Sequence, residues 1–182
     1  GYVIRKAANF DRLFAVDREM LFKFLNDTQP DTMEYLRKIY KDDLEDTIVS
    51  FINAETIKAR GSLIEVLKHG IEISNQKLEL MYTKPATTFN PELTRKYGQN
   101  IFSVMEEVWA SDKERIDMVI FLNGLAIISF ELKCNTAGQS YQDAIYQYRT
   151  ERSPKTRLFL FKAGCLVNFA MDLEEVYMTT KL

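Results

Sequence analysis

Two apolar runs joined by Asn123-Gly124 constrain the fold of this chain more than any other feature. Residues 116–122 and 125–130 are apolar apart from Asp117 and Ser129. An Asn-Gly pair between such runs is the strongest short-range signal of a β-hairpin. Nearly continuous apolar runs are typical of central strands that are buried on both faces. The sequence therefore predicts a central hairpin with strands at 116–122 and 125–133.

The rest of the chain predicts one sheet with helices around it. Helical spacing of apolar residues and start signals predict helices over 17–25, from Pro30, over 41–58, from Asn90-Pro91 and over about 140–149. Further strands are expected at 71–82, 102–109, 158–161, 165–170 and 176–180. This order indicates an α/β (α+β) class with a central mixed sheet. We expect a single domain over 1–182, mainly helical in 1–70 and sheet-rich in 71–182.

Composition narrows the class of protein. The chain is 46% hydrophobic and 27% charged, with a net charge of −2, so whole-chain charge does not suggest nucleic-acid binding. One His and two Cys without a CxxC pair argue against a zinc site or a disulfide framework. We find no membrane-spanning run and no signal peptide, and expect a cytoplasmic protein. The absence of an initial Met and the abrupt end suggest a fragment of a longer protein.

Three charged residues interrupt the apolar hairpin: Asp117, Glu131 and Lys133. Burying unpaired charge is costly, so these residues call for an explanation. Two neighbouring carboxylates suit a hard divalent cation such as Mg²⁺, which prefers oxygen ligands. A lysine two residues from Glu131 lies on the same side of the strand, where it can act on a water and on phosphate charge. The pattern outlines a phosphodiester-hydrolysis site, although such a triplet at an exposed strand end is usually a surface salt bridge.

The spacing of the two carboxylates makes a geometric prediction. In a regular two-residue hairpin, Leu122 pairs with Leu125, which sets Asp117 opposite Phe130 and on the other face from Glu131. A slip of one residue corrects this. We therefore expect an odd-length loop or a β-bulge within 116–133, with Gly124 at positive φ, or else Asp117 at a bend or end of its strand.

Longer strings point to a family. Asn9-Phe10-Asp11-Arg12, 24–30, 89–93, 143–152, 166–170 and 176–182 resemble the N-terminal part of the endonuclease (restriction) subunit of type I restriction-modification enzymes. The hairpin with Asp117 and Glu131-Leu132-Lys133 is similar to the catalytic core of PD-(D/E)xK nucleases. The resemblance implies a Mg²⁺-dependent nuclease acting on double-stranded DNA. It implies methylation and specificity subunits as partners, and ATP binding only in translocase domains outside this fragment, which has no P-loop string.

The resemblance leaves two points open. The family's Gln motif matches Gln147 by the surrounding string, whereas Gln142 and Tyr146 fit its literal spacing. We favour Gln147 as the fourth catalytic residue. The family also carries an acidic residue on a helix before this fragment begins, so the fragment need not be active alone. The alternative is a non-catalytic DNA-binding or assembly module that keeps the nuclease fold.

A basic stretch follows the predicted crossover helix. It contains Arg149, Arg152, Lys155, Arg157 and Lys162, with Glu151 as the only opposing charge. Basic side chains gathered in this way can contact DNA phosphates. We interpret Arg149, Arg152, Lys155 and Arg157 as DNA-binding, with a solvated loop as the competing interpretation.

Overall fold

The structure of the chain is a computed structural model, and it describes residues 1–87, 89–134 and 138–182. In chain order its elements are β1 (Val3–Arg5), the 3-10 turn η1 (Ala7–Asn9), β2 (Phe10–Asp11), β3 (Val16–Asp17), α1 (Arg18–Thr28), α2 (Pro30–Tyr40), the 3-10 turn η2 (Lys41–Asp43), α3 (Leu44–Ile57), α4 (Leu63–His69), β4 (Ile71–Ile73), β5 (Gln76–Leu78), α5 (Pro91–Gly98), β6 (Phe102–Trp109), β7 (Arg115–Leu122), β8 (Leu125–Leu132), α6 (Tyr141–Tyr146), the π-helix η4 (Gln147–Glu151), β9 (Val167–Met171) and β10 (Val176–Thr179).

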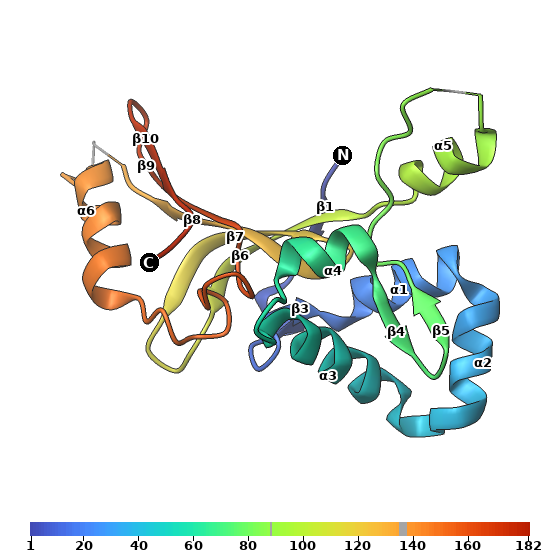
Figure 1. Cartoon of the computed structure of the whole chain (residues 1–182). Coiled ribbons are helices and arrows are strands. Elements are labelled where there is room, and N and C mark those ends of the chain that lie inside the picture. The colour runs from blue at the N-terminus through green and yellow to red at the C-terminus, as the bar shows by residue number, and fades with distance from the viewer. Residues whose placement is uncertain (88, 135–137) are drawn as a thin grey trace.

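A mixed sheet forms the centre of the molecule (Figure 1). Its strands follow the order β1-β6-β7-β8-β3-β2, and β9 pairs with both β8 and β10. Strands β6, β7 and β8 form an antiparallel meander, whereas β1 beside β6 and β9 beside β8 run parallel. Helix α6 lies on the crossover from β8 to β9. The predicted α/β class with a mixed sheet and flanking helices is therefore confirmed.

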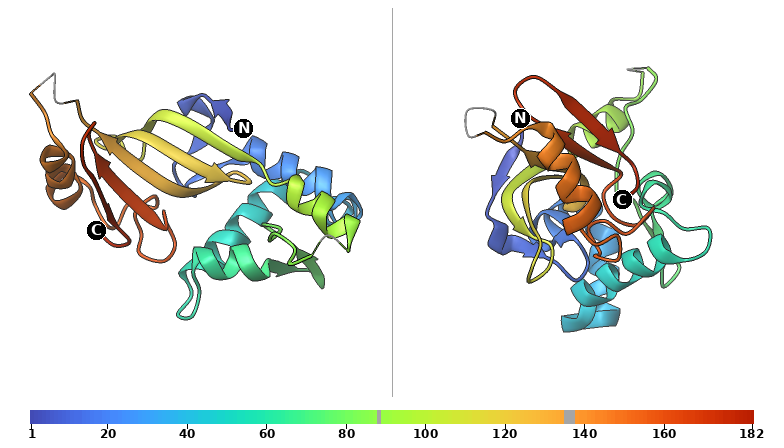
Figure 2. Two further views of the ribbon diagram at one scale, coloured as in Figure 1. Left: turned by 90° about the horizontal axis from the view of Figure 1, so that it is seen from above. Right: turned by 90° about the vertical axis from the view of Figure 1, so that its left-hand side faces the viewer.

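The helices gather at the two ends of the β7–β8 hairpin (Figures 1 and 2). Helices α1–α4 pack around the turn, where Leu21, Leu122, Leu125 and Ile127 belong to one buried cluster. Helix α6 and η4 pack near the open end in a second cluster, which includes Ala126. The adjacent β8 residues Ala126 and Ile127 therefore pack in different buried clusters. In the described part of the chain, no helix combines the length and apolar content needed to cross a bilayer.

The β7–β8 hairpin contains a β-bulge, which is one of the alternatives expected from the sequence, whereas its turn has two residues and is not the odd-length loop. Leu122 pairs with Leu125 across Asn123-Gly124, whose φ angles are 50° and 80°. Two positive φ values are the geometry that a tight two-residue turn requires. The register then shifts, because Phe121 pairs with Ala126 but Ile120 pairs with Ile128. Ile127 is the extra residue, and every pair beyond it follows the slipped register.

The turn end of the hairpin is closely packed, and both side-chain polar atoms of Asn123 are hydrogen-bonded. The Nδ2 of Asn123 donates to the Leu80 carbonyl oxygen at 2.9 Å and to Asn100 Oδ1 at 3.0 Å, and its Oδ1 accepts from the Ile101 N–H at 2.7 Å. A Cβ added to Gly124 would lie 2.4 Å from the Asp17 carbonyl oxygen. Only glycine fits this approach, so the turn fixes the hairpin against α1.

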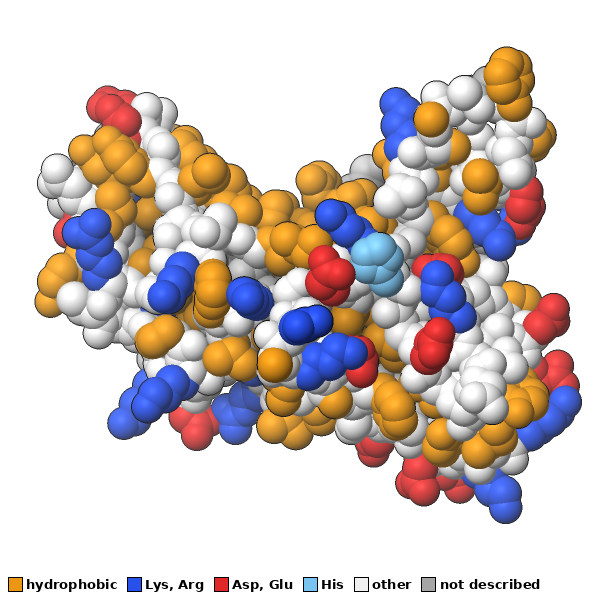
Figure 3. All heavy atoms as spheres, viewed as in Figure 1, with side chains coloured by type: hydrophobic (Ala, Val, Ile, Leu, Met, Phe, Trp, Pro, Cys, Tyr) orange, Lys and Arg blue, Asp and Glu red, His pale blue; other side chains and the backbone are white. Residues whose placement is uncertain are grey.

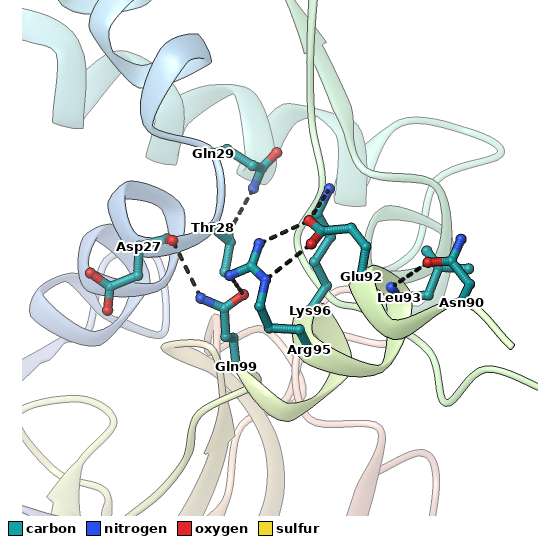
Figure 4. Close-up of polar contacts among 9 residues, drawn as sticks. All are labelled: Asp27, Thr28, Gln29, Asn90, Glu92, Leu93, Arg95, Lys96 and Gln99. Atoms are coloured by element: carbon teal, nitrogen blue, oxygen red, sulfur yellow. Dashed lines mark hydrogen bonds and ion pairs between the residues drawn. The ribbon is translucent and has the colours of Figure 1, made fainter. Parts of the chain in front are cut away.

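Helix starts follow the sequence prediction. Asp17 caps α1 by accepting from the Met20 N–H at 3.3 Å, and Pro30 is the first residue of α2. Asn90 caps α5 through the Leu93 N–H at 3.2 Å. Figure 4 shows α5 beside the end of α1, where Gln99 Nε2 donates to the Asp27 carbonyl oxygen at 3.4 Å. Short polar side chains thus define where these helices begin.

Three expected elements differ in the structure. The single strand expected over 71–82 is the β4–β5 hairpin, because Ser74 and Asn75 adopt positive φ angles and reverse the chain. The strand expected over 158–161 is a turn, in which the Leu160 carbonyl oxygen accepts from the N–H groups of Ala163 and Gly164. Residues 1–17, assigned to the mainly helical part, contribute β1, β2 and β3 to the sheet.

Candidate active site at the open end of the β7–β8 hairpin

Asp117 lies on β7, half-buried near the open end of the hairpin. The last printed pair before it is Met118 with Phe130, so the same register carried one residue further sets Asp117 opposite Glu131. Directly opposed residues of an antiparallel pair project from the same face. The Oδ2 of Asp117 accepts from the Leu132 N–H at 2.7 Å. The bulge therefore brings the two carboxylates together, as the spacing argument required.

Glu131 is fully buried on β8 and has one bonded and one unbonded carboxylate oxygen. Its Oε1 accepts from Arg152 Nε at 2.7 Å and lies 2.6 Å from Arg152 Nη2. Its Oε2 has no hydrogen-bond partner among the described residues. Burial raises the pKa of Glu131 to about 7, and Asp117 adds to the rise, whereas Arg152 and Lys133 oppose it. The carboxyl group can therefore exchange a proton near neutral pH.

Lys133 follows directly after β8 and continues the alternation of inward-facing and outward-facing side chains along that strand. Its N–H donates to the Met171 carbonyl oxygen at 2.9 Å, which keeps this residue beside β9. The side chain is half-buried, whereas Leu132 between it and Glu131 is exposed. The Lys133 ammonium is close enough to Glu131 to lower its pKa electrostatically. The two carboxylates and the lysine predicted from the sequence thus gather at one end of the hairpin.

Arg152 was predicted to contact DNA, but its side chain is buried in the structure. It follows η4 with only 9% of its surface exposed, and its N–H donates to the Gln147 carbonyl oxygen at 3.1 Å. Besides the two contacts to Glu131, its Nη2 donates to the Arg115 carbonyl oxygen at 3.0 Å. The guanidinium therefore orients the Glu131 carboxylate and ties β7 to the end of η4. Sequence reasoning missed this role, because nothing in the string indicates that Arg152 points inward.

Arg157 also faces the interior. Its Nε donates to Asn53 Oδ1 at 2.9 Å and its Nη2 to Thr56 Oγ1 at 3.2 Å, while Nη1 bonds the Ala163 carbonyl oxygen. Burial lowers the pKa of this guanidinium. Its contacts join α3 to the loop before β9. Of the four predicted DNA contacts, Arg149 and Lys155 are the two whose side chains are exposed.

The two glutamines considered for the site differ in their surroundings. Gln147 begins η4, and its Oε1 is buried without a hydrogen-bond partner among the described residues. Gln142 lies exposed in α6. Single-turn π-helices are frequent at functional sites, since they redirect side chains within a helix. Of the two glutamines, Gln147 is therefore the one with a buried side-chain oxygen that accepts no hydrogen bond from the described residues.

A buried network that sequence reasoning did not anticipate holds η4 against β8. The Oγ of Ser129 lies 2.8 Å from the Tyr148 hydroxyl and donates to Asn168 Oδ1 at 2.7 Å. Burial raises the pKa of Tyr148. The only signal in the sequence was Ser129, the single polar residue of its apolar run. The network connects β8, β9 and η4 beside Glu131, and so fixes the backbone from which Gln147 and Arg152 project.

The donors at the site fit a hard divalent cation. In the described ranges no three acidic, His or Cys side chains group closely enough to hold a metal. Mg²⁺ is nevertheless commonly held by one or two carboxylates, with waters and substrate phosphates completing its shell. The unbonded Oε2 of Glu131 is the oxygen left open for such a ligand. Asp117 and Glu131 are therefore the residues that would hold the cation.

The fold and the site together define a nuclease-like α/β domain. Its central hairpin carries an acidic pair and a lysine at one end. The family model described as type I restriction enzyme R protein N terminus matches residues 18–182. Since this match covers most of the chain, the chain belongs to that family. No curated protein matches the chain.

Proposed function

We propose that this domain hydrolyses DNA phosphodiester bonds as the nuclease module of a type I restriction enzyme. The observation that carries the proposal is the bulge at Ile127, which sets Asp117 against Glu131. The unbonded Oε2 of the buried Glu131 supports it, because an unsatisfied buried oxygen is costly unless a ligand uses it. Membership of the restriction family supports DNA as the proposed substrate class.

Each residue of the site has a role in this proposal. Mg²⁺, when bound, would polarise the phosphodiester and lower the pKa of a bound water. Asp117 and Glu131 would hold the cation, and Arg152 keeps Glu131 in place through two short contacts. Lys133 would orient the attacking water and offset the negative charge that builds on the phosphate. Gln147 would hydrogen-bond the water or a phosphate oxygen through its unbonded side chain.

The proposal extends to partners. The chain belongs to the family of type I restriction enzyme R protein N termini, which supports partners from such an enzyme. We propose double-stranded DNA as its substrate and the methylation and specificity subunits as its protein partners, with sequence recognition supplied by those subunits. ATP would act in translocase domains outside the residues of this chain. Arg149 and Lys155 stay predicted DNA contacts.

The test is plasmid cleavage by the complete enzyme that contains this domain, with Mg²⁺ and with Mg²⁺ removed by a chelator. We expect Asp117→Asn and Glu131→Gln each to reduce cleavage at least about 10³-fold, because each removes a ligand whose metal contributes several kcal/mol. Mn²⁺ binding by calorimetry should weaken in both variants. Glu106→Gln, an exposed carboxylate on β6, is the matched control and should cleave normally.

The outcomes separate two functions. Full cleavage by Asp117→Asn would exclude the proposed metal site. Absence of Mg²⁺-dependent cleavage in the wild-type enzyme would favour the alternative, a DNA-binding or assembly module that retains a nuclease-like fold.

A further inference from the structure

An exposed aromatic ring holds two lysines on the surface. Phe161 lies in the turn before β9 with 51% of its surface exposed. The Nζ of Lys162 lies 5.8 Å from its ring centroid, and the Nζ of Lys181 lies 5.3 Å from it. A ring attracts an ammonium placed over its face. Two flexible side chains from different parts of the sequence are therefore kept close together with their charges at the surface.

Arg60, in the connection between α3 and α4, adds positive charge beside Phe161. The Leu63 N–H donates to the Lys162 carbonyl oxygen at 2.6 Å, which joins the start of α4 to the Phe161 turn. A surface hollow of about 430 Å³ lies here, and Arg60, Phe161 and Lys162 are among its lining residues. Glu65 is the one acidic residue that lines it. We call Arg60, Phe161, Lys162 and Lys181 the Phe161 surface.

The charge at this surface contrasts with the rest of the molecule. Figure 3 shows Lys and Arg side chains crossing the middle of one face, over α4 and the turn before β9. Acidic side chains are instead frequent at the end of the molecule that carries α2 and α3 (Figure 3). The chain as a whole has a net charge of −2. The Phe161 surface is therefore a local basic region on a chain whose net charge is slightly negative.

We propose that the Phe161 surface binds the phosphodiester backbone of double-stranded DNA and so leads the duplex to the candidate active site. This inference rests on the proposed function. Lysine ammonium groups act as point charges that suit phosphates and carry no base preference. The aromatic ring contributes by holding two of them in place before binding, which reduces the entropy lost when DNA binds.

Strand β9 connects this surface to the candidate site. Leu166, which lines the hollow, donates its N–H to the Ile127 carbonyl oxygen at 2.8 Å. Four residues further along the chain, Ala170 pairs with Glu131. A strand rises roughly 3.3 Å per residue, so Leu166 and Ala170 lie roughly 13 Å apart. That separation corresponds to about four base pairs of duplex at 3.4 Å each.

The test measures binding of the full chain to a 30-base-pair duplex by fluorescence anisotropy, without divalent metal, across a salt series. The test variant is Lys162→Gln with Lys181→Gln. We expect a loss of at least about tenfold in affinity at 0.1 M salt and a salt slope lower by about 2, since each lost phosphate contact removes about 0.9. Phe161→Leu, which keeps the net charge, should weaken binding about two- to fivefold.

The matched control is Lys23→Gln with Lys38→Gln, which removes the same charge from exposed lysines of α1 and α2. This variant should bind like the wild type. Equal losses in both double variants, an unchanged salt slope, or no binding of the wild type at 0.05 M salt would overturn the proposal. Displacement of the duplex by polyglutamate at equal charge concentration would also overturn it and assign the surface to an acidic protein. Asp117→Asn should abolish cleavage without weakening DNA binding, since it removes a negative charge and no cation, so failure of the proposed function and failure of this surface are distinguishable.

Discussion

Asn123 and Glu131 are both fully buried at opposite ends of one hairpin, yet only Asn123 has both side-chain polar atoms bonded. At the turn end, hydrogen bonds tie the hairpin to residues 80, 100 and 101. At the open end, the Oε2 of Glu131 and the Oε1 of Gln147 have no hydrogen-bond partner in the part of the chain that the structure describes. Unsatisfied buried groups reduce stability and concentrate at functional sites. One end of the hairpin therefore stabilises the fold, and the other leaves two buried oxygen atoms that accept no hydrogen bond from the described residues.

The largest expected effect separates cleavage from metal binding at the open end. Lys133→Gln removes a charge that offsets the negative phosphate but removes no metal ligand. We expect cleavage by the complete enzyme to fall about 10²–10³-fold. Mn²⁺ binding, measured by calorimetry, should be retained. Lys113→Gln, in the exposed turn before β7, is the control, and a normal cleavage rate for Lys133→Gln would contradict its assigned role.

The next effect concerns the turn end. Gly124→Ala forces a side chain against the Asp17 carbonyl oxygen at positive φ. We expect the free energy of unfolding to fall by about 3 kcal/mol or more, from overpacking and backbone strain together. Gly138→Ala also falls at a positive φ, 73°, but nothing among the described residues lies within 4 Å of the added carbon, so this variant should cost about 1–2 kcal/mol. Urea denaturation of both variants measures the difference, and equal losses would show that close packing at the turn is unimportant.

The pH dependence of stability tests the raised pKa of Glu131 at the open end of the hairpin. The pKa of Glu131 is raised to about 7 in the folded state from an ordinary value of 4.5, so the unfolded chain releases this proton first. The wild type therefore loses stability as pH rises from about 5 to about 7, relative to Glu131→Gln, which does not titrate there. The stability difference should grow by about 1.4 kcal/mol per pH unit in this window and level off above it. Parallel stability curves for the two proteins would contradict the raised pKa.

The smallest effect tests the two glutamines. Gln147→Met removes a buried oxygen that lacks a partner, so we expect the free energy of unfolding to rise by about 1 kcal/mol. Cleavage should fall several-fold at the same time, because the side chain is proposed to face the reacting groups. Gln142→Met, at an exposed position of α6, should change neither measurement. A cleavage defect in Gln142→Met alone would reassign the motif.

Local patterns predicted the hairpin well. Asn-Gly located the turn, and the apolar runs gave strand bounds close to those of β7 and β8. The face of Asp117 required an odd-length loop, a bulge or a bend, and the structure contains the bulge. These features depend on neighbours in sequence and on strand geometry. The position of the bulge at Ile127 was not predictable from the sequence. Ile127 packs in one buried cluster and Ala126 in the other, and both clusters are formed largely by residues that are distant in the sequence.

Contacts across long distances in the sequence account for the remaining differences. The Arg152 guanidinium reaches Glu131 only because η4 ends beside the open end of the hairpin. Strands β1, β2 and β3 have two or three residues each, too few for an alternating pattern to be recognised. The apolar run 158–161 has the composition of a strand. It forms a turn instead, because the N–H groups of Ala163 and Gly164 donate hydrogen bonds to the Leu160 carbonyl oxygen. Pattern and propensity therefore located the site residues but not the partners that position them.

Because Ile127 has no partner on β7, the number of residues between Asp117 and Glu131 determines whether the two side chains lie on the same face of the sheet. Across a regular two-residue turn, the positions of paired residues always differ by an odd number. Positions 117 and 131 differ by an even number, so they can face one another only because one residue between them is left out of the ladder. Deleting or inserting a single residue in this interval would send one carboxylate to the opposite face of the sheet. In related chains that keep the two-residue turn, an even separation of these acids therefore identifies a bulge even where the residues around it have changed.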